Sequence, residues 1–274
     1  MTTGSYSIDL AGLAIALGMT ALASLAAAFM RLGVGRSLFF ASLRSLLQLC
    51  AMGFILRVII RAGNPWFVLA LGMAMLCAAV QITLSRAAGI PRGLAFPVFL
   101  TLALTMVFMI GFVVELIIRP TPWYAPQLVL PLTGMMLGNC VSAIAVAMTR
   151  FYESMNDRRD EVTTMLALGA TPWECSKPSV TSSMQLGLLP TIASLTSSGI
   201  VTIPGMMAGQ IIAGGDPINA AKYQFVVLTS IAALTLVADT LIMTRIYRTC
   251  FTVADQYQSR QPGNEPYNTS DSQG

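Results

Sequence analysis

Histidine is absent from this 274-residue sequence, and charged residues make up only 10% of it. Transition-metal sites favour imidazole ligands, so the sequence excludes a metal cage built on histidine. Soluble domains carry about a quarter charged residues, whereas 55% of the residues here are hydrophobic and the charged fraction is far smaller. The composition therefore predicts an integral membrane protein, and no nucleic-acid partner is expected.

Motifs for nucleotide and thiol chemistry are also missing. The only lysines are Lys177, which follows Ser176, and Lys222, which follows Ala221. A P-loop needs Gly-x-x-x-x-Gly-Lys-Ser/Thr to bind phosphates, and neither lysine fits this pattern. The five cysteines are odd in number and show no Cys-x-x-Cys spacing, which indicates reduced thiols. The chain is therefore expected to bind no cofactor, and any ATP hydrolysis must occur on a separate subunit.

Long apolar runs are what the sequence has instead. A helix that crosses a hydrocarbon core of about 30 Å needs about 20 apolar residues. Runs of this length predict an all-α protein with about seven transmembrane helices, namely Ile8–Met30, Leu38–Ile60, Trp66–Leu84, Phe96–Ile118, Leu128–Met148, Leu186–Ala213 and Gln224–Tyr247. They form one polytopic permease-like domain over residues 1–257, and residues 258–274 are polar enough to predict a disordered cytoplasmic tail.

The distribution of basic residues predicts the orientation of these spans. The segment "MTTGSYSIDL" has no Lys or Arg and so lacks the basic start of a signal peptide, and the first run is expected to be a retained span. With the N-terminus outside, twelve of the 16 basic residues fall on the inner side and four on the outer side. This positive-inside bias predicts an N-out, C-in topology.

The one large cytoplasmic loop, at about residues 150–185 between the fifth and sixth spans, predicts a helix, a turn and a second helix. Residues 157–168 place several apolar side chains on one side of a helix, which Gly169 can end. Thr171 can then cap a new helix, with Glu174 placed for a capping box. The expected result is an exposed apolar stripe, which can lie on the lipid surface or dock into a groove of a soluble partner.

Within this loop, "EVTTMLALGAT" resembles the cytoplasmic coupling motif of ABC-transporter permeases. The wider runs "LTGMMLGNCVSAIAVAMTRFYESM", "LGATPWE" and "GIVTIPGMMAGQIIAGGDPINAAKYQ" resemble the Fet-type iron-export permease family, which also includes a plant aluminium-tolerance permease. The resemblance is strongest over residues 131–224. It implies that the ATPase-coupling residues are Glu161, Met165, Leu168, Gly169, Ala170 and Trp173.

The resemblance also implies partners, a location and a substrate class. It implies a homodimeric permease in the plasma (inner) membrane, with an ABC ATPase subunit as partner, exporting iron or another metal. An ABC permease for a non-metal solute such as a nucleotide sugar stays open. So does a stand-alone ion-coupled carrier or channel, and so does a membrane scaffold that transports nothing.

A second region of interest is "SGIVTIPGMMAGQIIAGGDP", residues 198–217, which is apolar yet rich in glycine. Proline removes a helical hydrogen bond, and irregular backbone at membrane depth persists only when buried in protein or lining a water-filled cavity. We therefore expect a discontinuity at "IPGMMAGQ" that lines a translocation path, with Pro204 freeing the carbonyl of Ile200. The alternative is that the glycines only allow close helix packing. The expected path residues are Asn139, Pro204, Gly205, Met206, Met207, Gly209 and Gln210; the methionine pair is weak evidence for a metal site, and the metal ligands stay unknown.

Two ionisable residues lie inside predicted spans at about the same depth. Arg44 is about six residues from the inner end of the second span, and Asp239 is a similar distance from the inner end of the last. Charged groups in a membrane are costly and are usually paired or functional. The sequence favours a structural ion pair between Arg44 and Asp239, with a substrate site as the alternative.

Overall fold

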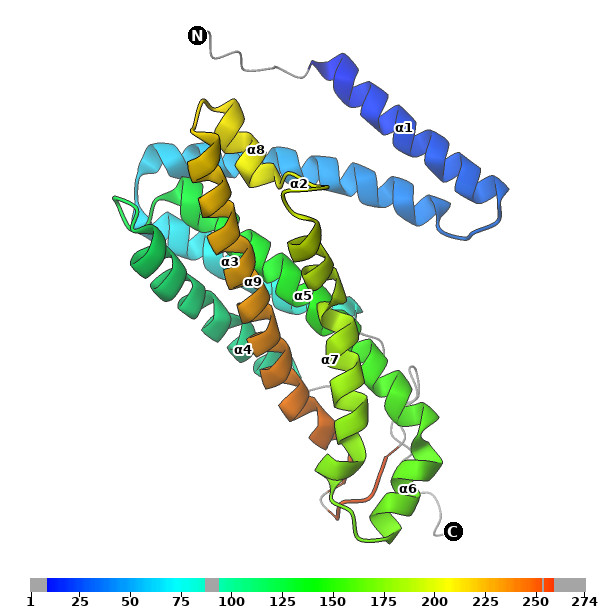
Figure 1. Ribbon diagram of the computed structural model, residues 1–274. Coiled ribbons are helices and arrows are strands. Elements are labelled where there is room, and N and C mark those ends of the chain that lie inside the picture. The colour runs from blue at the N-terminus through cyan, green and yellow to red at the C-terminus, as the bar shows by residue number, and fades with distance from the viewer. Residues whose placement is uncertain (1–8, 87–93, 253, 259–274) are drawn as a thin grey trace. The chain divides into compact units, whose positions relative to one another are not determined.

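The computed structural model describes residues 9–86, 94–252 and 254–258 (Figure 1). Within these ranges the secondary-structure elements are all helices, apart from two isolated β-bridges. The chain divides into two compact units, residues 1–64 and residues 65–274. The predicted all-α fold is confirmed.

Unit 1 is a pair of helices, α1 (Leu10–Phe29) and α2 (Gly35–Ala62). The Asp9 carboxylate caps α1 by accepting from the Leu10 amide at 2.7 Å. The two helices approach closely where Gly35 meets the backbone of Ser24, and a Cβ at Gly35 would overlap the Ser24 carbonyl oxygen. This hairpin carries the first two predicted spans.

Unit 2 is built around one long helix, α5 (Pro126–Asp157), which packs mainly against three other helices. These are α3 (Pro65–Arg86), α7 (Pro172–Ser197) and α9 (Pro217–Ile246). The core side chains of α5 are fully buried and apolar, among them Leu132, Ile144 and Phe151. Figure 1 shows α5 running beside α7 and α9 along most of the unit.

The remaining elements of unit 2 are shorter. Helix α4 (Ala95–Phe108) continues as a π-helix, η1 (Met109–Ile118), and α6 (Arg159–Ala167) follows α5 directly. In chain order, helix α8 (Gly205–Ile212) follows α7 and precedes α9, and a 3₁₀ turn, η2 (Tyr247–Cys250), follows α9. Helix α6 and η2 are therefore at one end of the unit, and α8 is at the other (Figure 1).

Six described helical stretches are long and apolar enough to cross a membrane, and they coincide with six of the seven predicted spans. The predicted sixth span, 186–213, is interrupted, as the expected discontinuity requires. Helix α7 ends at Ser197 and α8 begins at Gly205, with irregular backbone over residues 198–204. Helix α7 also begins fourteen residues earlier than the predicted span, because its polar first half continues the helix out of the loop. The number of spans and the N-out orientation stay predictions.

Candidate functional site

The turn between α6 and α7 confirms the predicted stop signal at Gly169. This glycine has a φ of +92°, which L-residues with a side chain rarely adopt. The Ala170 amide donates to the Met165 carbonyl and the Gly169 amide donates to the Leu166 carbonyl, both at 3.0 Å. This pair of hydrogen bonds is a Schellman motif, and it satisfies two carbonyls at the end of α6.

The predicted capping box at the start of α7 is also confirmed. The Glu174 carboxylate accepts from the Thr171 amide and from the Thr171 hydroxyl, both at 2.8 Å, and the Glu174 amide donates to the Thr171 hydroxyl at 3.4 Å. These hydrogen bonds, the backbone one first, hold the pKa of Glu174 below its ordinary value. The turn is thus fixed on both sides, by a glycine and by a cap.

Glu161 ties α6 to its neighbours through Arg158. The Arg158 guanidinium donates to both Glu161 carboxylate oxygens, at 2.6 and 2.8 Å, and also to the Ser179 hydroxyl of α7 at 2.9 Å. The Ser154 hydroxyl of α5 donates to the same Ser179 oxygen at 2.9 Å. The hydrogen bond from Arg158 lowers the pKa of Glu161. The network connects α5, α6 and α7 at the base of the turn.

The expected exposed apolar stripe on α6 is wrong for most of its length. Val162 is fully buried against the rest of the unit, and Met165 and Leu166 are half-buried. Leu168 at the tip of the turn is the exception, at 83% exposed. A partner that approaches this end meets one protruding leucine on a rigid turn.

Trp173, another expected coupling residue, contacts the end of α9. Its ring packs edge-on against Tyr247 of η2, with 5.0 Å between the centroids. This contact joins the start of α7 to the end of α9. Of the expected coupling residues, Glu161, Leu168, Gly169 and Trp173 are exposed, and Met165 and Ala170 are partly buried. Their contact with an ATPase stays a prediction.

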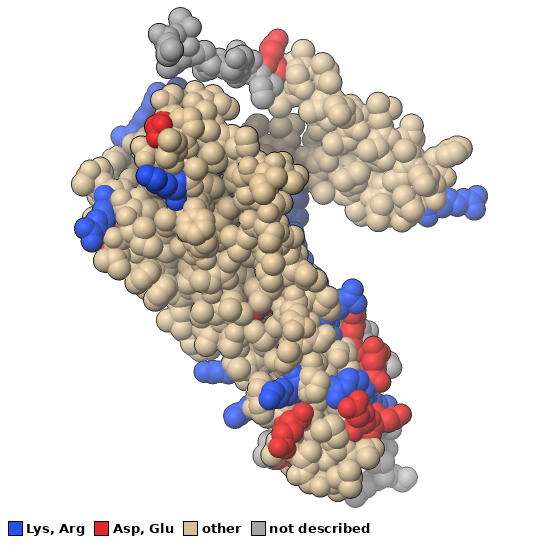
Figure 2. All heavy atoms as spheres, viewed as in Figure 1, with Lys and Arg blue, Asp and Glu red and all other residues tan. Residues whose placement is uncertain are grey.

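The charge on unit 2 is gathered at its ends. Figure 2 shows acidic and basic side chains mixed over the end that carries α6, with an uncharged surface between the two ends. Many large apolar side chains of unit 2 are exposed, among them Leu104, Leu189 and Ile192. A band of this kind suits contact with lipid.

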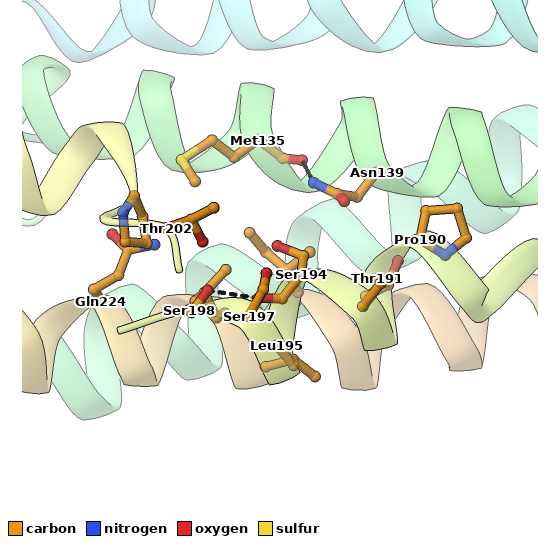
Figure 3. Close-up of a pocket in the computed structure, with 14 residues that line it drawn as sticks. Met135, Asn139, Pro190, Thr191, Ser194, Leu195, Ser197, Ser198, Thr202 and Gln224 are labelled. Atoms are coloured by element: carbon orange, nitrogen blue, oxygen red, sulfur yellow. Dashed lines mark hydrogen bonds between the residues drawn. The ribbon is translucent and has the colours of Figure 1, made fainter. Parts of the chain in front are cut away.

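A cavity of about 590 Å³ lies toward the other end of unit 2. Helices α5, α7 and α9 and the irregular segment 198–204 form its wall. In Figure 3, Ser194, Ser197 and Ser198 lie between Thr202 and Gln224 at one end and Pro190 and Thr191 at the other. Its remaining lining residues are Met135, Asn139, Ala193, Leu195, Pro204, Leu228 and Ile231.

Several polar groups of the cavity are already hydrogen-bonded. Asn139 donates from Nδ2 to the Met135 carbonyl at 2.8 Å, one turn back along α5. The Ser198 hydroxyl donates to the Ser194 carbonyl at 2.6 Å (Figure 3). Gln224 differs, because it is only 3% exposed and neither its amide nitrogen nor its amide oxygen has a partner among the described residues.

The predicted path residues divide into two groups. Asn139 and Pro204 line the cavity. Gly205, Met206, Met207, Gly209 and Gln210 instead form α8, and none of them lines it. The predicted discontinuity exists, but it occupies residues 198–204, while residues 205–210 of "IPGMMAGQ" are helical.

Pro204 also acts differently from the prediction. It is the N-cap of α8, with a φ of −60° and a ψ of 142°, so it is not inside a helix and frees no carbonyl at Ile200 in the predicted way. The break is made by a turn at Gly199, where φ is +88° and the Gly199 amide donates to the Thr202 carbonyl at 2.8 Å. Within this chain, a Cβ at Gly205 or Gly209 would meet nothing within 4 Å, so neither contacts a helix of this chain closely.

Sequence reasoning missed the hydroxyl-bearing wall of the cavity. Thr191, Ser194, Ser197 and Ser198 belong to the run "TIASLTSSG", whose density of Ser and Thr in an apolar region was the available signal. Gln224 was identified only as the start of the last span. No such signal marked Gly187, which lies where α5, α7 and α9 meet.

The predicted ion pair of Asp239 with Arg44 is not tested by the structure, and the metal ligands stay unknown. Asp239 is fully buried in unit 2, with neither carboxylate oxygen hydrogen-bonded within that unit. Arg44 is an exposed residue of α2 in unit 1, and its pairing with Asp239 stays a prediction. Among the described residues, no three His, Cys, Asp or Glu side chains group closely enough to hold a metal ion.

Six long apolar helices in the described part of the chain, with an uncharged surface between two charged ends of unit 2, are the features of a multi-pass helical membrane protein. Residues 10–251 match the model of the family described as "Uncharacterised protein family (UPF0014)", and the chain belongs to this family. No solved structure matches it.

Three relatives show the range of the family. A membrane protein of Synechocystis sp., slr1647, is 31% identical over 89% of this chain and 94% of its own length. Protein ALUMINUM SENSITIVE 3 of Arabidopsis thaliana is 29% identical over 79% of this chain and 78% of its own length. The probable iron export permease protein FetB of Escherichia coli is 27% identical over 89% of this chain and 94% of its own length. The resemblance to Fet-type and plant permeases is confirmed.

Proposed function

We propose that this chain is the permease subunit of an ABC transporter in the plasma (inner) membrane, and that it exports iron or another metal. It works as a homodimer with two copies of a separate ATPase subunit. The α6–α7 turn is the observation that carries the proposal, since it is a rigid feature with one protruding apolar side chain, Leu168. Metal as substrate and export as direction come from the similarity to the Escherichia coli permease.

The absence of a P-loop supports a separate ATPase. With only Lys177 and Lys222 in the chain and neither in the required pattern, ATP must be hydrolysed on a partner. The tip of the turn would bind in a groove of the partner. When the turn moves, the network from Glu161 through Arg158 to Ser179 would transmit the movement of the turn to α5 and α7. Binding of an amphipathic helix or turn in a groove is a common docking mode.

The test is co-purification of the ATPase with glycine variants matched in geometry. Gly169→Ala places a Cβ at a φ of +92°, and Gly214→Ala does the same at a φ of +89° at the other end of unit 2. Neither Cβ would meet an atom within 4 Å, so the two substitutions impose similar backbone strain. We expect Gly169→Ala to lose the ATPase and Gly214→Ala to keep it.

Glu161→Gln provides an independent variant, because it weakens the ion pair with Arg158 without changing the backbone. An intact complex in both Gly169→Ala and Glu161→Gln would refute the docking assignment. Transport by this chain alone in liposomes, driven by a gradient and indifferent to ATP, would favour the stand-alone carrier instead.

A further inference from the structure

The Gln224 side chain has hydrogen-bonding capacity that nothing in the described structure uses. Its amide offers two N–H donors and a carbonyl acceptor. Both polar atoms are buried and unpartnered on the wall of the cavity. Leaving such a group unpaired costs about 1–3 kcal/mol, so an amide in this position is expected to bind something that enters the cavity.

The hydroxyl groups beside Gln224 extend this capacity. The hydroxyls of Thr191, Ser194 and Thr202 make no hydrogen bond within the described residues, whereas Ser198 is engaged with a backbone carbonyl. Asn139 uses its Nδ2 on the Met135 carbonyl, which leaves its side-chain oxygen as an acceptor. Helices α5, α7 and α9 and the break after α7 thus each contribute a neutral polar group.

Among the described residues that line the cavity, none carries a charge, an imidazole or a thiol. An isolated ion transferred from water into such surroundings loses hydration that neutral hydroxyls and amides replace poorly. Transition-metal ions also favour imidazole, thiolate and carboxylate ligands, and this wall supplies none of them. The lining therefore disfavours both a bare divalent cation and a multiply charged anion.

We propose that this cavity binds an electrically neutral, oxygen-rich solute, so that a metal would enter it as a neutral chelate with oxygen ligands. The proposal rests on the transport function above and specifies the class of its substrate. A neutral polyol such as a sugar is also uncharged and has oxygen atoms that can accept from the Gln224 amide, and the test separates the two. The volume of about 590 Å³ exceeds that of a hydrated ion and accommodates either solute.

The position of the cavity suits a site on a transport path. Asn139 is thirteen residues along α5 from Pro126, or about 20 Å, and Gln224 is seven residues along α9 from Pro217, or about 10 Å. Both helices begin at the end of unit 2 opposite α6. The cavity therefore lies within the span of these helices, away from the proposed ATPase contact.

The experiment measures binding to the full chain in lipid nanodiscs by equilibrium dialysis without ATP. The probes are tris(maltolato)gallium(III), a neutral complex with six oxygen ligands, together with sucrose, aqueous Fe²⁺ under anaerobic conditions, and the anionic gallium–EDTA complex. Gallium does not change oxidation state, so binding is separated from redox chemistry. We expect one of the two neutral probes to bind, and the charged probes to bind at least tenfold more weakly.

The key variant is Gln224→Leu, with Gln81→Leu as its matched control. Gln81 is an exposed residue of α3 that does not line the cavity. Loss of two hydrogen bonds predicts about tenfold weaker binding of the neutral probe to Gln224→Leu, and unchanged binding to Gln81→Leu. Because the Gln224 amide has no partner among the described residues, the leucine variant should melt at the same or a higher temperature, which rules out unfolding as the cause.

The outcomes decide between the readings. Binding of the gallium complex identifies a chelate site, and binding of sucrose identifies a polyol site; either supports the proposal. Tighter binding of Fe²⁺ or the EDTA complex, no binding of either neutral probe, or binding unchanged in Gln224→Leu overturns it. Since the assay uses no ATP, loss of ATPase co-purification and loss of neutral-probe binding are separate failures.

Discussion

Gly187 of α7 faces the carboxylate of Asp239 of α9, and a Cβ on the glycine would lie 3.2 Å from Asp239 Oδ2. The same Cβ would lie 2.8 Å from the Ala143 carbonyl oxygen and 3.1 Å from the Ala147 Cβ of α5. Two of these three neighbours are a backbone atom and a short side chain, which cannot rotate away. Three helices therefore meet at a position where only glycine fits.

We predict that Gly187→Ala destabilises the protein by about 1–3 kcal/mol, the usual cost of overpacking a core. The measurement is chemical or thermal unfolding in detergent. Gly138→Ala on α5 is the control, since a Cβ there would meet nothing within 4 Å and alanine favours a helix. Equal stability of Gly187→Ala and the parent protein would contradict the close crossing of α5, α7 and α9.

The capping box at Thr171 gives a second prediction. Thr171→Ala removes the hydroxyl that accepts from the Glu174 amide, so the first turn of α7 should be less stable by about 1 kcal/mol of free energy. Hydrogen exchange of the amides near Glu174 should become faster. Thr164→Ala is the control, because the Thr164 hydroxyl donates to the Asp160 carbonyl within the same helix. Similar exchange in the two variants would argue against the cap.

A third prediction concerns acid. The pKa values of Glu161 and Glu174 are both lowered from an ordinary value of 4.5 by hydrogen bonds from Arg158 and Thr171. A lowered folded-state pKa means that each carboxylate stabilises the turn fully above pH 4.5, and that this contribution is lost as pH falls through the lowered value. The protection of amides around the α6–α7 turn against hydrogen exchange, corrected for the slower intrinsic exchange in acid, should therefore fall in that acid range.

Glu161→Gln checks the origin of this acid response. The variant should exchange faster at neutral pH and show a smaller change on acidification. An acid response of undiminished size in Glu161→Gln and in Glu174→Gln would show that other groups cause it.

A fourth prediction concerns water access. Because the cavity is lined by the end of α7 and not by α8, we expect the water-accessible positions at the end of α7. In a background without the five native cysteines, Ser194→Cys should react with a water-soluble thiol reagent, with a rate that changes on adding ATP and the ATPase. Ile192→Cys, an exposed apolar position of α7 that does not line the cavity, should react mainly with a lipid-soluble reagent. The opposite pattern would place the cavity outside the transport path.

The sequence predicted local features well because their causes are local. Gly169, Thr171 and Glu174 lie within six residues of one another, and a stop signal followed by a cap is legible in that window. Most spans were legible for the same reason, since each is a continuous apolar run. Their ends were less so: α5 continues through Asp157, nine residues beyond its predicted end.

The cavity could be predicted only in part, through Asn139 and Pro204, since its wall comes from segments far apart in sequence. Asn139, Ser194 and Gln224 lie on three helices, and each is an ordinary polar residue in its own segment. Pro204 shows the related limit, because a proline can kink a helix or start one. Only the turn at Gly199, whose position depends on how α7 ends, decides that it starts α8.

Helix α7 joins the two regions in one element. It begins directly after the capped turn and ends at the hydroxyls of the cavity, and its 26 residues span about 39 Å. Near its start, Ser179 accepts a hydrogen bond from Arg158. In its middle, Gly187, 15 residues from Pro172, packs closely against α5 and α9. That crossing can act as the fulcrum of a lever: a tilt of about 5° about Gly187 would displace the Ser197 end by about 1 Å and the turn by about 2 Å in the opposite direction. A small displacement of the α6–α7 turn would thus produce a smaller displacement, in the opposite direction, of the groups that line the cavity.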